Sequence, residues 1–525
     1  MRFFNTAGPV DCQRHYCLPP LERLNLKQVL PLIEQQKYFV LHAPRQTGKT
    51  SSLLALMEYL NAQGRYRCLY VNVEVGQSAR EEVGEALRAM LSELATWSRI
   101  VLNDHFIDET WPAVLAKSGP HAALGDVLSL WSAHDPRPLV LLIDEIDALV
   151  GDTLIAVLRQ LRAGYARRPR YFPQSVILCG VRDVRDYRIH SASEKAIITG
   201  GSAFNIKAAS LRLEDFSQME VEALYRQHTE ETGQIINPNA LERLWELTQG
   251  QPWLVNALGY ETCFEMEAGQ DRSQPITAAM VDDAKENLIL RRETHLDQLA
   301  DKLQEERVRR VIEPLLAGQV ELEDVPTDDI DYVRDLGLIR MDREIRIANP
   351  IYREVIPRQL TYSTEVMTHQ QVAWYLQADG RLNLNQLLIA FQEFFREHAE
   401  HWVERFQYKE AGPQLLLQAF LQRLVNGGGR IEREYGLGRM RTDLLVLWPY
   451  PGGVQKVVIE LKVLYKTLEY TVTAGLEQTW SYLDRCGAEE GHLVIFDRTP
   501  HKPWEKKLFQ REAAIHGRTI QVWGM

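Results

Sequence analysis

The stretch YFVLHAPRQTGKTSS, residues 38–52, decides the fold of the N-terminal half of this 525-residue chain. Its apolar start, Tyr38 to Leu41, predicts a buried β-strand, and the residues from Ser51 to Leu60 predict a helix. The intervening segment, Ala43 to Thr50, is a phosphate-loop pattern with alanine at the first position, where glycine is usual. Because a loop between a strand and a helix N-terminus turns backbone N–H groups toward phosphate oxygens, the stretch predicts a nucleotide site.

Each residue type in this loop suits a nucleotide triphosphate with Mg²⁺, and we expect ATP. Gly48 lets the backbone approach the phosphates closely. Lys49 has the reach to span the β- and γ-phosphates, and the Thr50 hydroxyl is a ligand for Mg²⁺. The predicted nucleotide-binding residues of the loop are Ala43, Pro44, Arg45, Gln46, Thr47, Gly48, Lys49, Thr50 and Ser51.

A second apolar strand, Leu139 to Ile143, ends in two carboxylates. Asp144 is placed to hold Mg²⁺, and Glu145 to polarise the attacking water, so the pair predicts ATP hydrolysis as well as binding. A core strand with a solvated acidic end is the alternative. Arg182 or Asp183, after a later apolar run, would occupy the position of a γ-phosphate sensor; a surface salt bridge explains either residue equally well.

Short apolar runs alternate with helical stretches up to about Leu213, which predicts a parallel sheet with crossover helices. The phosphate loop, the Asp144–Asp147 segment and the tripeptide Gly250-Gln251-Pro252 together resemble the AAA-like ATPases grouped with archaeal-type and signal-transducing NTPases. This resemblance covers residues 1–355. It implies a helical lid that brings Pro252 near the nucleotide, a winged-helix module after the lid, and a nucleotide-driven switch. A plain helix-breaking turn at Gly250 is the alternative.

Two strands near the C-terminus carry a second set of chemical groups. Asp443 lies near the start of the first strand, and Glu460 and Lys462 lie on the next, where a period of two places them on the same face. Two carboxylates on one Mg²⁺, with a lysine beside them, are suited to metal-assisted phosphodiester hydrolysis. A charged edge hairpin is the alternative.

The pattern Asp, gap, Glu-x-Lys resembles the PD-(D/E)XK nucleases. Gln478 and Tyr482, four residues apart on a following helix, also accompany that nuclease core in several branches. The resemblance implies a restriction-endonuclease-like domain in which Asp443 and Glu460 hold Mg²⁺ and Glu460, Lys462 and Gln478 take part in catalysis. It implies nucleic acid as the substrate, with DNA favoured over RNA. Thr442 replaces the usual proline, which lowers the specificity of the match.

The expected fold class is therefore α/β and multidomain: a three-layer P-loop core, a helical lid, a winged helix and a C-terminal nuclease-like domain. The expected boundaries are 1–213 for the core, 214–295 for the lid, 296–357 for the winged helix, 358–404 for a linker with helices and 405–525 for the nuclease-like domain.

Composition limits the remaining possibilities. A formal net charge of −11 gives the chain no overall basic field, so any nucleic-acid binding must use local patches. The six cysteines are scattered, which predicts free thiols, no disulfides and no zinc site. With no membrane-length apolar run, the chain is expected to be cytoplasmic and without a membrane partner. A homo-oligomer is left open, because an arginine acting from a second subunit commonly completes such sites.

Our leading hypothesis is an ATPase switch that controls a Mg²⁺-dependent nuclease, in prokaryotic defence or mobile-element control. The alternative is an ATPase signalling or scaffold protein whose C-terminal domain binds partners or nucleic acid without cutting. The presence of Asp443, Glu460 and Lys462 together favours cutting. The basic residues Arg162, Arg167, Arg168 and Arg170 are interpreted as a solvated face.

Overall fold

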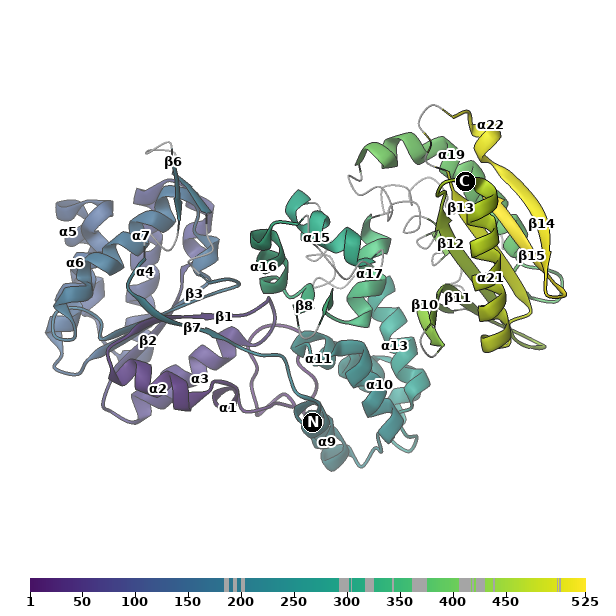
Figure 1. Cartoon of the computed structure of the whole chain (residues 1–525). Helices are drawn as coiled ribbons and strands as arrows, with labels where there is room; N and C mark the ends of the chain where they lie inside the picture. Colours follow the sequence, from purple (N-terminus) through teal and green to yellow (C-terminus); the bar gives the residue numbers. More distant parts are fainter. Residues whose placement is uncertain are drawn as a thin grey trace. The chain divides into compact units, whose positions relative to one another are not determined.

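A computed structural model describes most of the chain (Figure 1). It leaves out residues 184–187, 192–195, 200–203, 292–301, 304, 317–324, 342–343, 361–374, 406–416, 418–419, 422–429, 438–439, 498 and 500–501. It describes the backbone alone at residues 188–191, 196–199, 290, 313, 316, 356–360, 394, 397–405, 430, 432–437 and 440–443. The chain divides into two compact units, residues 1–297 with 326–352 and residues 298–325 with 353–525.

A parallel five-stranded sheet forms the centre of the first unit, which confirms the predicted α/β core. Its spatial order is β2-β3-β4-β1-β7, so β4 lies between the strand before the phosphate loop and the strand that ends in the carboxylates. The carboxyl ends of these three strands therefore meet at one edge of the sheet. The strands are β1 (Tyr38–His42), β2 (Arg67–Asn72), β3 (Leu139–Asp144), β4 (Ser175–Gly180) and β7 (Lys207–Arg212).

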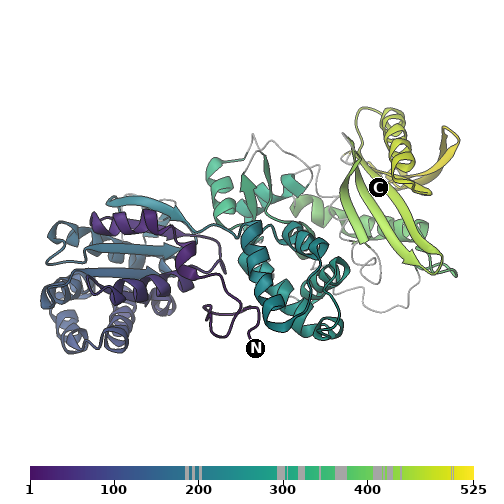
Figure 2. The ribbon, with the colours of Figure 1, turned by 90° about the horizontal axis from the view of Figure 1, so that it is seen from below.

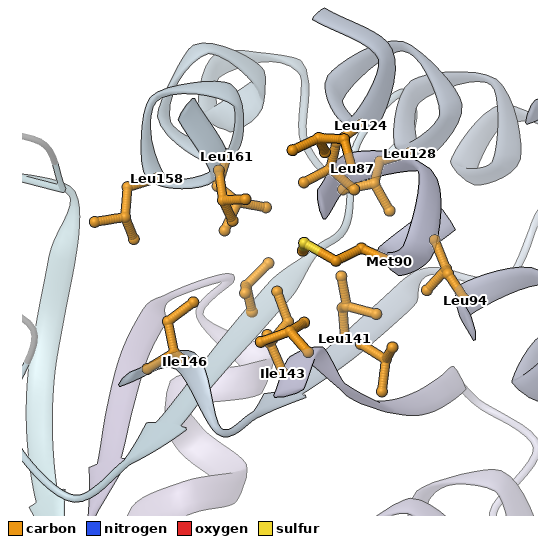
Figure 3. Packing of buried hydrophobic residues seen from close by; sticks show 14 of the residues in the cluster. Leu87, Met90, Leu94, Leu124, Leu128, Leu141, Ile143, Ile146, Leu158 and Leu161 are labelled. Carbon is orange, nitrogen blue, oxygen red and sulfur yellow. The ribbon is translucent and has the colours of Figure 1, made fainter. Parts of the chain in front are cut away.

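Helices cover both faces of this sheet (Figure 2). Since successive strand residues point to opposite faces, Leu141 and Ile143 pack under one helical layer, and Val140 and Leu142 under the other. The first layer is α4 (Val83–Leu102), α6 (Pro120–His134) and α7 (Gly151–Gly164), with its leucines and Met90 lying over β3 (Figure 3). The second layer is α2 (Leu26–Glu34) and α3 (Lys49–Ala62).

The rest of the first unit is mainly helical. Around the core lie α1 (Pro20–Arg23), α5 (Phe106–Ser118) and the hairpin β5 (Arg188–Ser191) and β6 (Ala196–Thr199). The lid region contains α9 (Gln218–Thr232), α10 (Pro238–Thr248), α11 (Pro252–Tyr260), α12 (Glu267–Gln270) and α13 (Ala278–Leu290). The unit ends with α16 (Thr327–Asp335), the hairpin β8 (Ile339–Met341) and β9 (Ile345–Ile347), and the start of α17 (Pro350–Leu360).

A mixed six-stranded sheet forms the centre of the second unit, with spatial order β10-β11-β12-β13-β15-β14. β12 pairs antiparallel with β11 and parallel with β13, and α21 is the crossover between the two parallel strands. The strands are β10 (Arg430–Leu437), β11 (Met440–Tyr450), β12 (Gly453–Val463), β13 (Glu490–Phe496), β14 (Phe509–Ile515) and β15 (Arg518–Gly524). The helices are α15 (Glu306–Leu316), α19 (Leu384–Arg405), α21 (Leu468–Cys486) and α22 (Trp504–Lys507).

This second sheet is also covered on both faces. Leu445 and Val458 pack with the apolar side of α21, whereas Leu444 and Ile459 pack with residues of α19. Gly475 brings α21 close to the sheet, because a Cβ atom there would lie 2.6 Å from the Leu493 side chain. The unit is thus a three-layer α/β/α arrangement. In the part of the chain that the structure describes, every helix is too short or too polar to span a membrane.

The predicted winged-helix module extends across the two units, with α15 in the second and α16 and the β8–β9 hairpin in the first. The order helix, helix, hairpin agrees with the expectation, and the hairpin is present. The packing of these parts as one module stays a prediction, as do the five domain boundaries. Most of the expected linker, residues 361–374, lies outside the described residues.

The lid depends on a glycine that no other residue can replace without strain. Gly250 has φ of +80°, and a Cβ atom there would lie 1.9 Å from the backbone oxygen of Phe216. We expect Gly250→Ala to lower the unfolding midpoint of the chain and to speed hydrogen exchange in α10 and α11. Gly233→Ala is the matched control, since Gly233 has φ of +76° but open space around it. Both replacements carry the backbone cost of about 1–2 kcal/mol, and equal effects would contradict the steric argument.

Candidate functional site

The phosphate loop connects β1 directly to α3, as predicted. Gly48 is the residue before the helix and has φ of +91°, which an L side chain rarely adopts. Gln46 also has positive φ, at 57°, and the Thr47 hydroxyl donates to the Pro44 carbonyl at 2.9 Å. Arg45 and Gln46 are exposed, whereas Ala43, Pro44, Thr47 and Ser51 are buried. The loop is therefore a compact turn with two outward side chains.

Lys49 is buried and its ammonium is held inside the loop. It donates to the carbonyls of Ala43 and Pro44, each at 2.9 Å. Both acceptors are neutral, and a phosphate oxygen is a stronger acceptor for an ammonium because the bond becomes charge-assisted on both sides. When a phosphate binds, the Lys49 ammonium can therefore donate to a phosphate oxygen in place of the two loop carbonyls.

Asp144 is a buried carboxylate of the site, and both of its oxygens accept hydrogen bonds. It is 0% exposed, and its Oδ2 accepts from the Thr50 hydroxyl at 2.7 Å and from the Tyr70 hydroxyl at 3.1 Å. Its other oxygen accepts from the backbone N–H of Glu145 at 3.0 Å. A carboxylate and a hydroxyl in contact are the oxygen donor set that a P-loop Mg²⁺ uses, so Thr50 and Asp144 fit that ion.

Glu145 follows at the end of β3 in a strained backbone conformation. Its φ is +56°, in the region that only glycine, asparagine and aspartate adopt readily. Burial raises the pKa of its carboxyl, and Lys49 opposes that rise. A raised pKa makes the carboxylate a better proton acceptor, which suits the predicted role beside an attacking water.

The sensor position after β4 makes different contacts from those expected. Arg182 lies over the ring of Tyr332 in α16, with the guanidinium 4.7 Å from the ring centroid. Asp183 is buried and forms an ion pair with Lys207 of β7. A sensor role for Arg182 therefore stays a prediction, and what the structure gives is a contact between this strand end and α16.

A cleft of about 130 Å³ opens beside the loop. One wall is the N-terminal segment from Asn5 to Leu18, another is the loop itself, and the third is the start of α11 with Pro252. The N-terminal segment is hydrogen-bonded to both other walls: the N–H of Val10 donates to Ser51 Oγ at 3.0 Å, and Trp253 Nε1 donates to the Thr6 carbonyl at 3.0 Å. Pro252 thus lies at the nucleotide cleft, together with residues that the sequence did not indicate.

The cleft residues that the sequence analysis missed include Tyr16, Arg23, Trp253 and Asn256. The position of Trp253 directly after Pro252 was a usable signal, because Pro252 itself was expected to lie near the nucleotide. Tyr16 carried no such signal. Its hydroxyl bonds His228 Nδ1 at 3.2 Å, a contact between residues 212 positions apart in the chain.

Arg23 ties the phosphate loop to the segment that leads into the lid. Its guanidinium donates to the Thr47 carbonyl at 2.5 Å and to the Glu214 carbonyl at 2.6 Å, and it lies over the Phe216 ring at 4.7 Å. Burial lowers its pKa to about 10, so it stays protonated at neutral pH. Arg23 therefore positions the loop relative to the lid through two backbone oxygens.

The prediction that the chain has no disulfide is wrong. Cys12 and Cys17 are bonded, with their Cα atoms 5.3 Å apart. The scattered spacing of the six cysteines hid this pair, because a short loop can bring two nearby thiols together without any recognisable motif. Cys17 lines the cleft, and its backbone N–H and carbonyl both bond the Gln227 amide. The expected compartment rested in part on unpaired thiols, and it stays a prediction.

Two of the groups predicted for phosphodiester chemistry, Glu460 and Lys462, lie on β12, one of the two central strands of the second sheet. Glu460 is only 2% exposed, and Lys462 donates to its Oε1 at 2.6 Å. Both residues share strand parity with Val458, so they lie on the sheet face covered by α21. The structure thus places Glu460 and Lys462 on the same face of the sheet, as the period of two predicted.

Asp443 belongs to the backbone of β11, and its side chain lies outside the described residues. Leu444 pairs with Ile459, so position 443 is the next one in register opposite Glu460. Gln478, in contrast, is exposed on α21, while Tyr482 is buried in the core on the same helix. A shared role for these two residues at one site therefore stays a prediction.

The disulfide gives a testable consequence for the cleft. The Cys12–Cys17 bond closes a loop that contains Tyr16, which contacts His228. The loop begins two residues after Val10, which contacts Ser51. A loop of this size restricts the open segment by about 2 kcal/mol at most, which corresponds to about thirtyfold in affinity. We therefore expect a dithiol reductant to weaken nucleotide binding measurably, by no more than about thirtyfold, in a calorimetric titration. The double variant Cys12→Ser with Cys17→Ser should bind like the reduced chain and ignore the reductant. Equal affinity in all forms would show that the loop does not order the cleft.

Comparison with known proteins identifies the family of the chain. A profile of the AAA-like domain family matches residues 21–355. Similar solved structures include a Walker-type ATPase of Pyrococcus abyssi, with 15% identity over 67% of this chain and 99% of that chain at a TM-score of 0.45. Cdc6p of Pyrobaculum aerophilum is 13% identical, with 68% of this chain and 100% of that chain covered and a TM-score of 0.36. The RuvB Holliday junction branch migration motor of Thermotoga maritima is 14% identical, with 64% of this chain and 94% of that chain covered and a TM-score of 0.34.

No curated protein matches the chain. The family match covers more than half of the sequence and includes the loop, both acidic residues of β3 and the lid. Nucleotide binding at the loop follows from that membership. The chain belongs to the AAA-like domain family and is a P-loop ATPase.

Proposed function

We propose that this ATPase is a switch for a Mg²⁺-dependent nuclease formed by the second unit. The observation that carries the proposal is the buried Glu460 with Lys462 at 2.6 Å, on the strand next to position 443 of β11. A buried carboxylate is retained at such a position only when a partner compensates its charge. Here the partner is the ammonium that phosphodiester hydrolysis uses.

The roles of the nuclease residues follow from their chemistry. Glu460 and Asp443 would hold Mg²⁺, which when bound supplies positive charge against the phosphate. Lys462 would orient the attacking water and stabilise the negative charge that develops on the phosphate oxygens. Gln478, exposed on α21, would contact the substrate. The substrate is nucleic acid, with DNA favoured over RNA.

At the first site, the proposed ligands are ATP and Mg²⁺. Lys49 would bind the β- and γ-phosphates, Thr50 and Asp144 would hold Mg²⁺, and Glu145 would accept a proton from the attacking water. The cleft walls support this, since the loop lies at one side and the start of α11 at the other. Arg182 would report the γ-phosphate through its contact with Tyr332.

The proposed switching would run through contacts inside the first unit. Gly337, two residues after the end of α16, is so close to the loop that a Cβ atom there would lie 2.6 Å from the Pro44 side chain. Arg340 of β8 bonds Asp215 Oδ2 at 2.8 Å and the Gln249 carbonyl at 2.5 Å. Because Lys49 holds the Pro44 carbonyl, phosphate binding would alter the loop at the residue that Gly337 packs against. The chain then continues from Tyr352 into the second unit.

The winged-helix packing of α15, α16 and the β8–β9 hairpin belongs to this proposal, as does an assembly of several copies. The proposal also includes a role for this nuclease in prokaryotic defence or mobile-element control. The alternative is a signalling or scaffold ATPase whose second unit binds nucleic acid or a partner without cutting.

The proposed ATP chemistry predicts that one variant loses ATP binding and that another keeps binding but loses turnover. Lys49→Ala removes the ammonium for the phosphates, so ATP binding should fall at least tenfold and turnover should disappear. Glu145→Gln keeps the shape but removes the proton acceptor, so turnover should fall roughly a hundredfold or more with binding retained. Phosphate release and nucleotide titration measure the two quantities. Lys27→Ala, an exposed lysine of α2, is the control. Turnover retained in Glu145→Gln would remove Glu145 from the chemistry.

The nuclease half predicts metal-dependent cutting that requires Lys462. Lys462→Ala should lower cleavage of plasmid, linear and single-stranded DNA or RNA roughly a thousandfold in Mg²⁺ or Mn²⁺, with ATP turnover unchanged. Lys456→Ala is the matched control, an exposed lysine on the same strand. Repeating the assay with ATP and in Glu145→Gln gives the sign of regulation.

Absence of cutting by the wild type under every condition, with ATP turnover present, would contradict the nuclease proposal and favour the scaffold alternative. Loss of both activities in Lys462→Ala would indicate misfolding, which an unfolding curve of the variant would reveal.

A further inference from the structure

Two tyrosines are exposed directly after the strand that carries Glu460 and Lys462. Tyr465 is 62% exposed and Tyr470 is 54% exposed, among the large apolar side chains most open to solvent in the described part of the chain. Their rings lie 6.2 Å apart at an interplanar angle of 60°. Lys466 lies between them, with its Nζ 5.2 Å from each ring centroid. These three side chains form one surface cluster, which we term the tyrosine platform.

The backbone under the tyrosine platform is anchored at several points. Tyr465 donates its N–H to Thr471 Oγ1 at 3.1 Å and accepts from that hydroxyl at 2.9 Å. The Thr467 side chain accepts from the N–H of Tyr470 at 3.2 Å and begins α21. The N–H of Leu464 donates to the Phe496 carbonyl at 2.9 Å. The two rings are therefore presented from a fixed segment, which lowers the entropy lost when a ligand stacks on them.

The segment also holds an unfavourable conformation. Lys466 has φ of +57°, a left-handed conformation that a lysine adopts rarely. In this conformation the Lys466 ammonium lies 5.2 Å from the centroid of each ring, while both tyrosines stay largely exposed. Burial of apolar surface does not account for it, because both rings stay exposed. Strained residues of this kind concentrate at binding sites.

We propose that the tyrosine platform stacks unpaired bases of a single-stranded nucleic acid, with Lys466 at a backbone phosphate. Base stacking on aromatic rings tolerates any sequence and needs open ring faces near positive charge. The platform lies three residues after Lys462, so it would hold a strand next to the groups that cut it. The identity of the polymer rests on the proposed nuclease function; the stacking itself rests on the geometry of the cluster. The substrate class is thus single-stranded DNA or RNA, or the unpaired end of a duplex.

The test measures binding without cutting. The full chain is titrated, in buffer with a chelator and no divalent metal, into labelled oligo-dT and oligo-U, a duplex of equal length, and an abasic oligomer with the same phosphates. Tyr465→Ala and Tyr470→Ala should each weaken single-strand binding roughly tenfold. Tyr465→Phe and Tyr470→Phe should stay within about twofold, because stacking needs the ring and not the hydroxyl. Tyr171→Ala, an exposed tyrosine of the first unit, is the control.

Each outcome decides the proposal. Single-strand binding that exceeds abasic binding and falls in the alanine variants supports it. Equal binding of oligo-dT and the abasic oligomer, unchanged binding in both alanine variants, or the absence of single-strand binding would overturn it. The nuclease proposal is tested separately. If single-strand binding depends on the two rings but the wild type never cuts, the tyrosine platform is supported and the nuclease proposal is contradicted. If cutting depends on Lys462 but binding does not depend on the rings, the nuclease proposal is supported and the tyrosine platform is contradicted.

Discussion

The hydrogen bonds that Asp144 accepts from Thr50 and Tyr70 join three elements of the first unit at one carboxylate oxygen. A fully buried carboxylate is tolerated only with such partners, since an unpaired charge in the interior is very costly. The bonds fix the start of α3 against the ends of β2 and β3. The placement of Lys49, one residue before Thr50, depends on this fixed point, and so does that of Glu145, one residue after Asp144.

The local parts of both sites could be read from the sequence. A strand, a phosphate loop and a helix in succession left little freedom for Lys49 and Thr50. The period of two along β12 was enough to place Glu460 and Lys462 on one face. These features depend on residues within a few positions of one another, where backbone geometry alone decides the outcome.

The parts that escaped prediction depend on contacts between distant segments. The packing of Gly337 against Pro44 is invisible in either local pattern, and so is the carbonyl contact by which Arg23 holds Thr47. The bond between Cys12 and Cys17 escaped for a different reason, because spacing alone does not report whether a loop folds back. Helical spacing groups Gln478 with Tyr482 on α21, but spacing does not report burial: Gln478 is exposed and Tyr482 is buried, and the role of Gln478 stays a prediction.

The N-terminal segment gives the nucleotide cleft an unusual place in the folding order. Tyr16 meets His228 across 212 positions of sequence, and Phe4 packs on Tyr225 with ring centroids 4.7 Å apart. Closing a loop of that length costs chain entropy before any contact compensates it, so such contacts form late. During synthesis the first wall of the cleft emerges long before the lid helix it packs on. A ribosome-bound chain would thus carry a finished phosphate loop for some time before it has a complete cleft.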